Sequence, residues 1–141
     1  PVYELNRIKN GADFVTPEGE VIPNHRLTRP SAPARKYAYC SDTIYRPEIV
    51  DQIKGVDLLF HEATFAQTEQ ARAKETHHTT AAQAAQMALN AEVKQLVIGH
   101  FSARYEDETV LLNEAAAIFP QTILARENMC IELEGGAVHE K

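Results

Sequence analysis

Side chains that could hold a metal ion or transfer a proton recur at one kind of position in this sequence, directly after a predicted β-strand. The strands are expected to end near residues 40, 60 and 98, and the polar residues that follow them are Asp42, the pair His61 and Glu62, and His100. In α/β proteins, ligand sites gather beyond the carboxyl edge of the sheet. Imidazole and carboxylate groups are also zinc ligands. These residues therefore predict a reactive or metal-binding site at that edge.

His78 occupies a second favourable position, shortly before a predicted helix. Thr80 and Gln83 have the spacing of a capping box, which marks the start of this helix. Backbone amides are unpaired at a helix N-terminus and the helix dipole is positive there, so the position attracts an anion such as phosphate. A histidine beside a bound phosphate suits the role of proton donor.

Each of these residues also has a plain structural interpretation. Asp42 taken alone is more often a helix or turn cap than a metal ligand. His61 on an apolar strand suits a core histidine, and Glu62 could simply bond to nearby backbone. For His78 and His100, functional and structural roles fit the local sequence equally well. The prediction depends on the combination of residues.

The elements that must position these residues alternate between strands and helices from residue 36 onward, which predicts an α/β layer structure. The expected strands cover 36–40, 58–60, 95–98, 122–125 and 129–133, and the expected helices cover 47–54, a segment from residue 80 and a segment from 107 to Pro120. Residues 1–35 are rich in turn formers and predict loops with one hairpin. We divide the chain accordingly into residues 1–35, 36–133 and a loose tail, 134–141.

The composition is that of an ordinary globular protein. Of the 141 residues, 20 are acidic and 14 are basic, which gives a net charge of −6. General electrostatic binding of nucleic acid is therefore not expected, and a polyanion would need a local patch. The chain has two cysteines, no signal peptide and no apolar run of membrane-spanning length, so we expect a cytoplasmic protein without membrane contact.

The ligands for a zinc ion are incomplete in this sequence. A catalytic zinc takes about three protein ligands and a water molecule, and only Asp42 and His100 are well placed. The motifs H-x-H-x-D-H and H-E-x-x-H are absent, and Cys40 and Cys130 do not have the spacing of a metal site.

Four segments in order resemble the ribonuclease Z family: YCSDT at 39–43, HEAT at 61–64, HTT at 78–80 and GHFSARY at 99–105. The resemblance implies the C-terminal half of a metallo-β-lactamase αββα sandwich, with a mixed sheet and flanking helices. Residues 36–133 would form this half-domain, while residues 1–35 match the family only loosely. Members of this family are endonucleases that remove the 3′ trailer from precursor tRNA.

The resemblance also implies roles for individual residues. Asp42 would bridge two zinc ions and His100 would be a terminal ligand to one of them. His78 would donate a proton to the leaving 3′ oxygen, and Glu62 would help to position it. Arg104 and Ser102 would contact RNA or phosphate. The residues that would support the site are His61, Thr64 and Thr79.

The chain lacks one part of the family's pattern. The family's H-x-H-x-D-H motif, which would supply the other zinc ligands, is missing here. We therefore expect an isolated chain without activity, which needs the N-terminal half of the same fold and precursor tRNA as substrate, and whose intact form is a homodimer. Two alternatives stay open. One is another phosphodiesterase or arylsulfatase-like hydrolase of the same fold, and the other is a non-catalytic half-domain used for subunit association.

Overall fold

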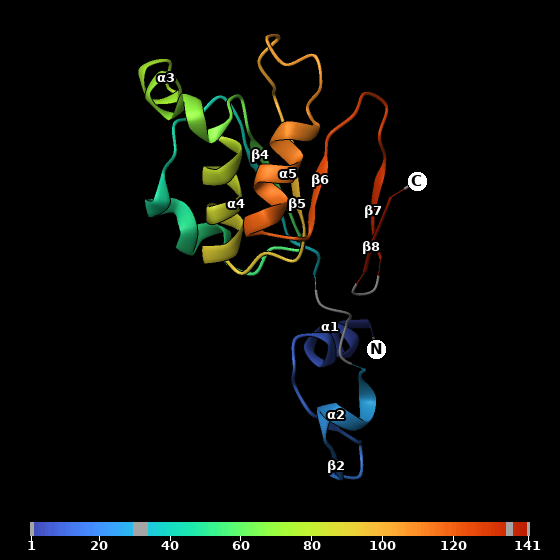
Figure 1. Ribbon diagram of the computed structural model, residues 1–141. Coiled ribbons are helices and arrows are strands. Elements are labelled where there is room, and N and C mark those ends of the chain that lie inside the picture. The colour runs from blue at the N-terminus through green and yellow to red at the C-terminus, as the bar shows by residue number, and fades with distance from the viewer. Residues whose placement is uncertain (1, 30–33, 135–136, 141) are drawn as a thin grey trace. The chain divides into compact units, whose positions relative to one another are not determined.

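The computed structural model describes residues 2–29, 34–134 and 137–140 of the chain. These residues form two compact units, Pro1–Ala34 and Arg35–Lys141 (Figure 1). Each unit is described by itself below.

The first unit is built around the predicted hairpin. Its strands β1 (Phe14–Val15) and β2 (Val21–Ile22) pair antiparallel. Two helices that the sequence did not predict flank the hairpin, α1 (Val2–Lys9) and the short α2 (Asn24–Leu27). The Asn24 side chain explains part of this arrangement, because its amide donates hydrogen bonds to the carbonyls of Ile8 and Ala12. The end of α1 is thereby tied to the start of α2.

The second unit contains a four-stranded parallel sheet in the order β3-β4-β5-β6. Its strands are β3 (Tyr37–Cys40), β4 (Leu58–Glu62), β5 (Leu96–Gly99) and β6 (Thr122–Leu124). All four were predicted, although β4 runs two residues further than expected. Strands β4 and β5 are buried along almost their whole length, as is usual for the central strands of a parallel sheet.

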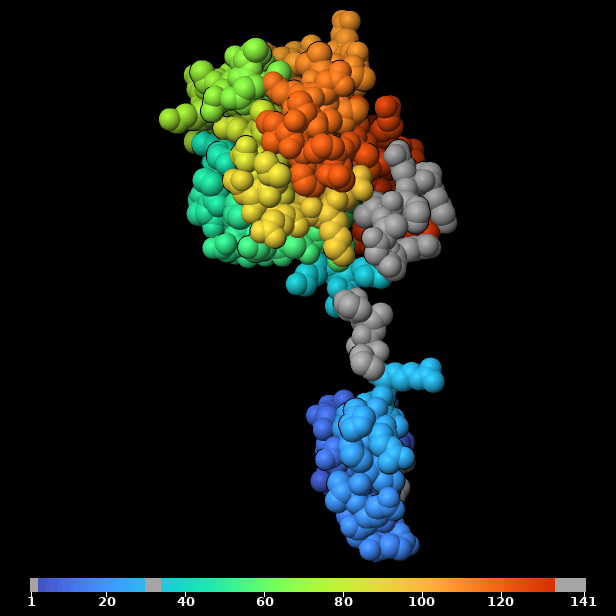
Figure 2. All heavy atoms as spheres, turned by 60° about the horizontal axis from the view of Figure 1, so that its bottom comes forward, coloured from blue at the N-terminus to red at the C-terminus, as the bar shows by residue number. Residues whose placement is uncertain are grey.

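Helices α4 (Ala81–Asn90) and α5 (Thr109–Ile118) lie side by side on one face of the sheet (Figure 1), and Figure 2 shows yellow and orange atoms of this region next to each other. The predicted capping box starts α4, since the hydroxyl of Thr80 accepts from the amide of Gln83 and the side chain of Gln83 accepts from the amide of Thr80. The inner face of α4 is mostly alanine, which lets the helix approach the sheet closely. Asp107 accepts a hydrogen bond from the amide of Thr109 at the start of α5 (2.9 Å).

The connections contain shorter helical segments. The predicted helix after residue 47 is the 3₁₀ helix η1 (Pro47–Ile53). Between β4 and α4 lie η2 (Gln67–Glu69) and α3 (Gln70–Glu75), neither of which was predicted. The segment η2 contacts α4, and α3 leads the chain back to His78, whose amide donates to the carbonyl of Ala73.

The C-terminal part forms an antiparallel hairpin of β7 (Ile131–Glu134) and β8 (Ala137–Glu140). The first strand agrees with the prediction for 129–133. Residues 137–140 were expected in a loose tail and form β8 instead. Residues 135, 136 and 141 of that tail lie outside the described residues.

Together, the parallel sheet and the helices that pack on it confirm the predicted α/β class. The helices of the described residues include none with the length and apolar character needed to cross a bilayer.

A buried carboxylate connects three strands at the edge opposite to the site. Asp57 accepts hydrogen bonds from the amide of Lys36 (2.8 Å) and from Nζ of Lys94 (2.6 Å), which precede β3 and β5. The hydrogen bond from Lys94 is the main reason that the pKa of Asp57 is lowered from its ordinary value. The ionised carboxylate therefore stabilises the fold above the ordinary pKa of aspartate, and this contribution is lost as the pH falls through the lowered pKa.

We predict that Asp57→Asn lowers the free energy of unfolding near neutral pH, and that its difference from the parent chain shrinks in acid. Urea unfolding followed by circular dichroism between neutral and acidic pH measures this difference. Asp51→Asn, at an exposed aspartate, is the matched control. A difference that stays constant down to the acid transition would contradict the assigned role of the carboxylate.

Candidate metal centre

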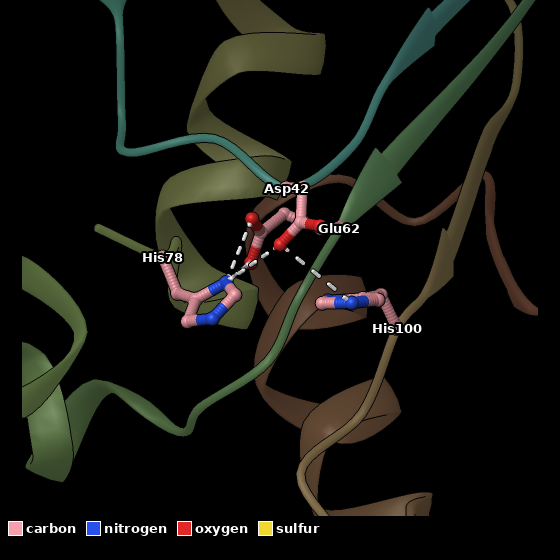
Figure 3. Close-up of side chains that lie close together, drawn as sticks. All are labelled: Asp42, Glu62, His78 and His100. Atoms are coloured by element: carbon pink, nitrogen blue, oxygen red, sulfur yellow. Dashed lines mark hydrogen bonds and ion pairs between the residues drawn. The ribbon is translucent and has the colours of Figure 1, made fainter. Parts of the chain in front are cut away.

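The parallel strands bring the predicted polar residues to one edge of the sheet. In the register, Cys40 lies opposite His61, and Glu62 lies opposite Gly99. Asp42 and His100, which follow β3 and β5, therefore converge on the end of β4 (Figure 3). Glu62 is the last residue of β4, not the second residue after the strand as predicted. With His78, these residues form a group whose possible ligand atoms all lie within 4.8 Å of one another.

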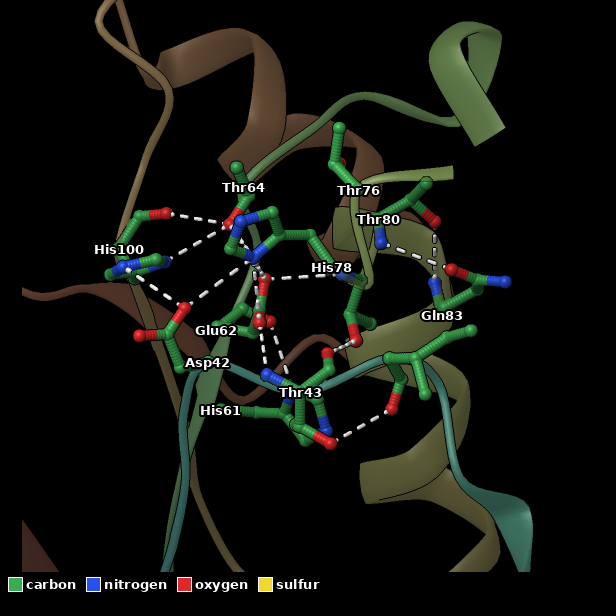
Figure 4. A network of polar contacts seen from close by, with 12 residues as sticks. Asp42, Thr43, His61, Glu62, Thr64, Thr76, His78, Thr80, Gln83 and His100 are labelled. Carbon is green, nitrogen blue, oxygen red and sulfur yellow. Dashed lines mark hydrogen bonds and ion pairs between the residues drawn. The ribbon is translucent and has the colours of Figure 1, made fainter. Parts of the chain in front are cut away.

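The carboxylate of Glu62 is completely buried and lies at the centre of the group (Figure 4). It accepts hydrogen bonds from the amide of Thr43 (2.5 Å), the hydroxyl of Thr64 (2.6 Å) and the amide of Thr79 (3.1 Å). Burial alone would raise the pKa of Glu62, but the hydrogen bonds outweigh burial and hold this pKa below its ordinary value. Because both oxygens are engaged, Glu62 is better placed to orient its neighbours than to bind a metal ion.

The ring of His78 is oriented by Glu62. Its Nδ1 lies 3.1 Å from each carboxylate oxygen of Glu62. A carboxylate only accepts hydrogen bonds, so the hydrogen on this side of the ring is carried by Nδ1. Nε2 is the nitrogen that remains for a substrate. The side chain is 21% exposed, so it is both held and accessible.

Thr64 determines which nitrogen of His100 carries hydrogen. Its hydroxyl lies 2.6 Å from Oε2 of Glu62 and 2.9 Å from the carbonyl of His100, and both of these atoms are acceptors. The single hydroxyl hydrogen is therefore used on one of them. Nδ1 of His100, 3.1 Å from the same hydroxyl, must then donate its hydrogen to it. Nε2 of His100 consequently keeps its lone pair.

The free lone pairs of His100 and Asp42 face each other. Oδ1 of Asp42 lies 3.8 Å from Nε2 of His100. Zinc lies about 2.0 to 2.2 Å from such ligand atoms, so two ligands of one ion are at most about 4.3 Å apart. The two side chains are 77% and 43% exposed and are open to an incoming ion. This donor set fits a metal ion, although it provides fewer ligands than a complete zinc site.

Asp42 and His100 both adopt an unusual backbone conformation. Asp42 has φ of 52° and His100 has φ of 59°, in the left-handed region that side chains other than glycine seldom adopt. Such conformations cost free energy and persist where the surrounding structure enforces them, often at functional sites. The sequence contains no direct signal for this feature, because neither residue is a glycine or part of a recognisable tight turn.

The other predicted residues of this region occupy different environments. Thr79 is buried, and its hydroxyl donates to the carbonyl of Thr43. His61 faces the core, where burial lowers its pKa, and its Nε2 has no hydrogen-bond partner among the described residues. His61 thus has the core position that was one of its two interpretations.

Several amides at the start of α4 are already engaged, which leaves fewer of them for an anion than the sequence predicted. The amides of Thr79, Thr80 and Ala81 already donate to Glu62, Gln83 and the carbonyl of Phe65. Binding of an anion beside His78 would therefore depend on side chains more than on the helix dipole.

Arg104 and Ser102 lie in the segment after β5. The guanidinium of Arg104 pairs with Glu69 and lies 5.3 Å from the ring centre of Phe65. Ser102 donates its amide hydrogen to the carbonyl of Thr64. Glu69 also lies within hydrogen-bond distance of the hydroxyl of Tyr105 (3.2 Å). The prediction overlooked this role of Glu69, because nothing in the local sequence links two residues so far apart.

The comparisons with known proteins agree with this architecture. A comparison with models of protein families found no match. Among solved structures, the metallo-β-lactamase fold protein YhfI from Bacillus subtilis superimposes with a TM-score of 0.62 at 20% identity, over 77% of this chain and 41% of that one. The chain thus has the fold of part of a metallo-β-lactamase-fold protein, as predicted, although its four-stranded sheet is parallel throughout and not mixed as expected.

Curated relatives are far more similar in sequence. The protein named Ribonuclease Z from Bacteroides thetaiotaomicron is 94% identical over 133 residues, which are 94% of this chain and 42% of that protein. Ribonuclease Z from Bacteroides fragilis is 79% identical over 133 residues, which are 44% of its length. Over these residues the chain belongs to the ribonuclease Z family, and it spans less than half the length of the curated relatives that it matches.

Proposed function

We propose that this chain is part of a zinc-dependent endoribonuclease that removes the 3′ trailer from precursor tRNA. The observation that carries the proposal is the site itself. The ligating atoms of Asp42 and His100 are open and face each other, while Glu62 holds His78 beside them. The relatives named Ribonuclease Z support the choice of substrate. A homodimer is proposed for the intact protein on the same resemblance.

Different residues are proposed to bind the metal and to transfer the proton. Asp42 has two carboxylate oxygens, so it is the proposed bridging ligand for two zinc ions, and His100 is the proposed terminal ligand. When bound, zinc in such sites polarises the phosphate and lowers the pKa of a water molecule. With hydrogen on both ring nitrogens, His78 would donate the one on Nε2 to the leaving 3′ oxygen and keep the one on Nδ1, which donates to Glu62 and holds the ring.

Arg104 and Ser102 remain proposed contacts to RNA or phosphate. For Arg104 the structure adds a condition, because its guanidinium is paired with Glu69 and a phosphate must compete with that carboxylate. Ser102 is half-buried and lies two residues after His100, within the segment that leads away from the site.

The proposal includes the inactivity of the isolated chain. Two open ligands are fewer than the three that a catalytic zinc ion normally takes from a protein. The missing ligands would come from the rest of the fold, which the longer relatives carry. Zinc should therefore bind weakly to the isolated chain, with no stoichiometric binding at submicromolar affinity in calorimetry.

The activity is tested by supplying the missing part. We expect no cleavage of a precursor tRNA by the isolated chain. When the chain is joined to the remaining part of the Bacteroides thetaiotaomicron relative, we expect cleavage that leaves a 3′ hydroxyl on the tRNA and a 5′ phosphate on the trailer. A joined protein that hydrolyses a nitrophenyl phosphodiester but not precursor tRNA would instead support the alternative of a small-molecule phosphodiesterase.

Separate losses are expected for the metal ligand and the proton donor. In the joined protein, Asp42→Ala should lose bound zinc, as measured by elemental analysis. His78→Ala should keep its zinc and lower kcat by about two to four orders of magnitude, the range for loss of a general acid. Loss of zinc in His78→Ala together with its retention in Asp42→Ala would show that the two roles are wrongly assigned.

Glu62→Gln tests the buried positioning group. The amide nitrogen that replaces one oxygen would face hydrogen-bond donors, so we expect a loss of about 1 to 3 kcal/mol in the free energy of unfolding for the stranded groups. In the joined protein kcat should fall while KM changes little. Glu106→Gln, at an exposed glutamate, is the control. Unchanged stability and unchanged kcat in Glu62→Gln would remove Glu62 from this role.

A further inference from the structure

Residues 63–67, which we call the β4 loop, follow β4 and contact both histidines of the candidate site. The hydroxyl of Thr64 lies 3.1 Å from Nδ1 of His100 and 3.4 Å from Nδ1 of His78 (Figure 4). The ring of Phe65 lies edge-on to the ring of His78, with 6.1 Å between the ring centres. The position of the β4 loop therefore influences where the two imidazole rings lie.

Backbone hydrogen bonds also join the β4 loop to the segment that carries His78. The amide of Phe65 donates to the carbonyl of Thr79 (3.4 Å), and the carbonyl of Phe65 accepts from the amide of Ala81 (2.9 Å). These two bonds form a short parallel bridge between Phe65 and Thr80. A displacement of the β4 loop at Phe65 would therefore displace Thr79, the residue that directly follows His78.

The far end of the β4 loop is held by two side chains from other parts of the chain. The hydroxyl of Tyr105 accepts a hydrogen bond from the amide of Ala66 (2.8 Å). The carboxylate of Glu114, on α5, accepts from the amide of Gln67 with both oxygens (2.9 and 3.0 Å). The partners are 39 and 47 residues apart in the sequence, so neither hydrogen bond belongs to a local turn.

The hydroxyl of Tyr105 is well suited to hold the amide of Ala66. It lies 3.2 Å from a carboxylate oxygen of Glu69, to which it donates its hydrogen, and a lone pair is left for the amide. Burial raises the pKa of Tyr105, so the hydroxyl keeps this hydrogen. Ala66 is only 8% exposed, so water cannot easily replace the hydroxyl as acceptor.

We propose that Tyr105 and Glu114 are positioning residues that hold the β4 loop, so that His78 presents Nε2 to the leaving oxygen. This inference rests on the proposed function, in which His78 is the proton donor. Both residues act through the backbone of Ala66 and Gln67. Their loss should therefore slow the step that needs a proton more than the binding of metal or substrate. If they only stabilised the fold, the kcat of the folded protein would not change.

Tyr105→Phe removes the hydroxyl and keeps the ring. In the joined protein we expect kcat for precursor tRNA to fall about ten- to a hundredfold, because a displacement of about 1 Å at a catalytic group can have such an effect. KM should stay within about twofold of the parent value, and the zinc content should not change. Rates are measured well below the melting temperature of each variant. Tyr37→Phe, at an exposed tyrosine, is the matched control and should keep the parent kcat.

The leaving group separates an effect on the proton donor from a general disturbance of the site. A bis-nitrophenyl phosphodiester releases nitrophenolate, a weak base that departs without a proton, whereas the 3′ oxygen of RNA departs more easily with one. We expect Tyr105→Phe to hydrolyse the nitrophenyl diester within about threefold of the parent rate. An equal loss on both substrates would overturn the proposal, as would an unchanged kcat for precursor tRNA.

Two substitutions of Glu114 test the second contact. The side-chain oxygen of Glu114→Gln can still accept from the amide of Gln67, so kcat for precursor tRNA should stay within about threefold of the parent value. Glu114→Ala has no acceptor, and its kcat should fall about tenfold or more. Asn113→Ala, at an exposed residue of the same helix, is the control. Equal kcat values for Glu114→Ala and Asn113→Ala would overturn the role of Glu114.

Amide hydrogen exchange in this chain, followed by NMR in EDTA, tests the anchoring of the loop without zinc or RNA. The amide of Ala66 should be protected in the parent chain and should exchange at least about tenfold faster in Tyr105→Phe. The amide of Lys94, which donates to the carbonyl of Val56, should exchange equally in both. An unprotected Ala66 in the parent chain would overturn the proposal. Faster exchange of Ala66 in Tyr105→Phe, together with a joined parent protein that does not cleave precursor tRNA, would support the anchoring and contradict the proposed function.

Discussion

A fully buried, ionised carboxylate organises this molecule. Removing the charge of Glu62 from water is costly unless hydrogen bonds compensate for it. The compensating donors come from three separate segments of the chain, after β3, after β4 and before α4. Through Thr64 the same network reaches His100, after β5. The requirement to satisfy one buried charge therefore brings every element of the site to the same point.

Much of this arrangement was predictable from local sequence. The alternation of strands and helices, the capping box at Thr80 and the positions of Asp42 and His100 at strand ends follow from short-range patterns. The convergence of Asp42, Glu62 and His100 then follows from the geometry of a parallel sheet. Such patterns depend on residues close together in the chain, and they are reliable for that reason.

The features that were not predictable depend on contacts between distant residues. The strand β4 continues through Glu62 because that carboxylate is satisfied by other segments, which no local pattern reveals. The amide of Thr79 is occupied by the same carboxylate, and the amide of Ala81 by the carbonyl of Phe65. Likewise, the pairing of Arg104 with Glu69 joins the loops after β5 and β4, and it becomes visible only once both loops are placed. The helix α1 has only eight residues, too few for periodicity to indicate it.

The left-handed backbone at Asp42 and His100 has an evolutionary consequence. Glycine adopts this conformation without the steric penalty that a side chain meets there, so folding alone would favour glycine at both positions. The site, in contrast, uses the side chains of Asp42 and His100, which glycine lacks. Natural selection for stability and selection for the site thus act in opposite directions at these positions, and a lineage released from the need for the site would be expected to drift towards glycine there.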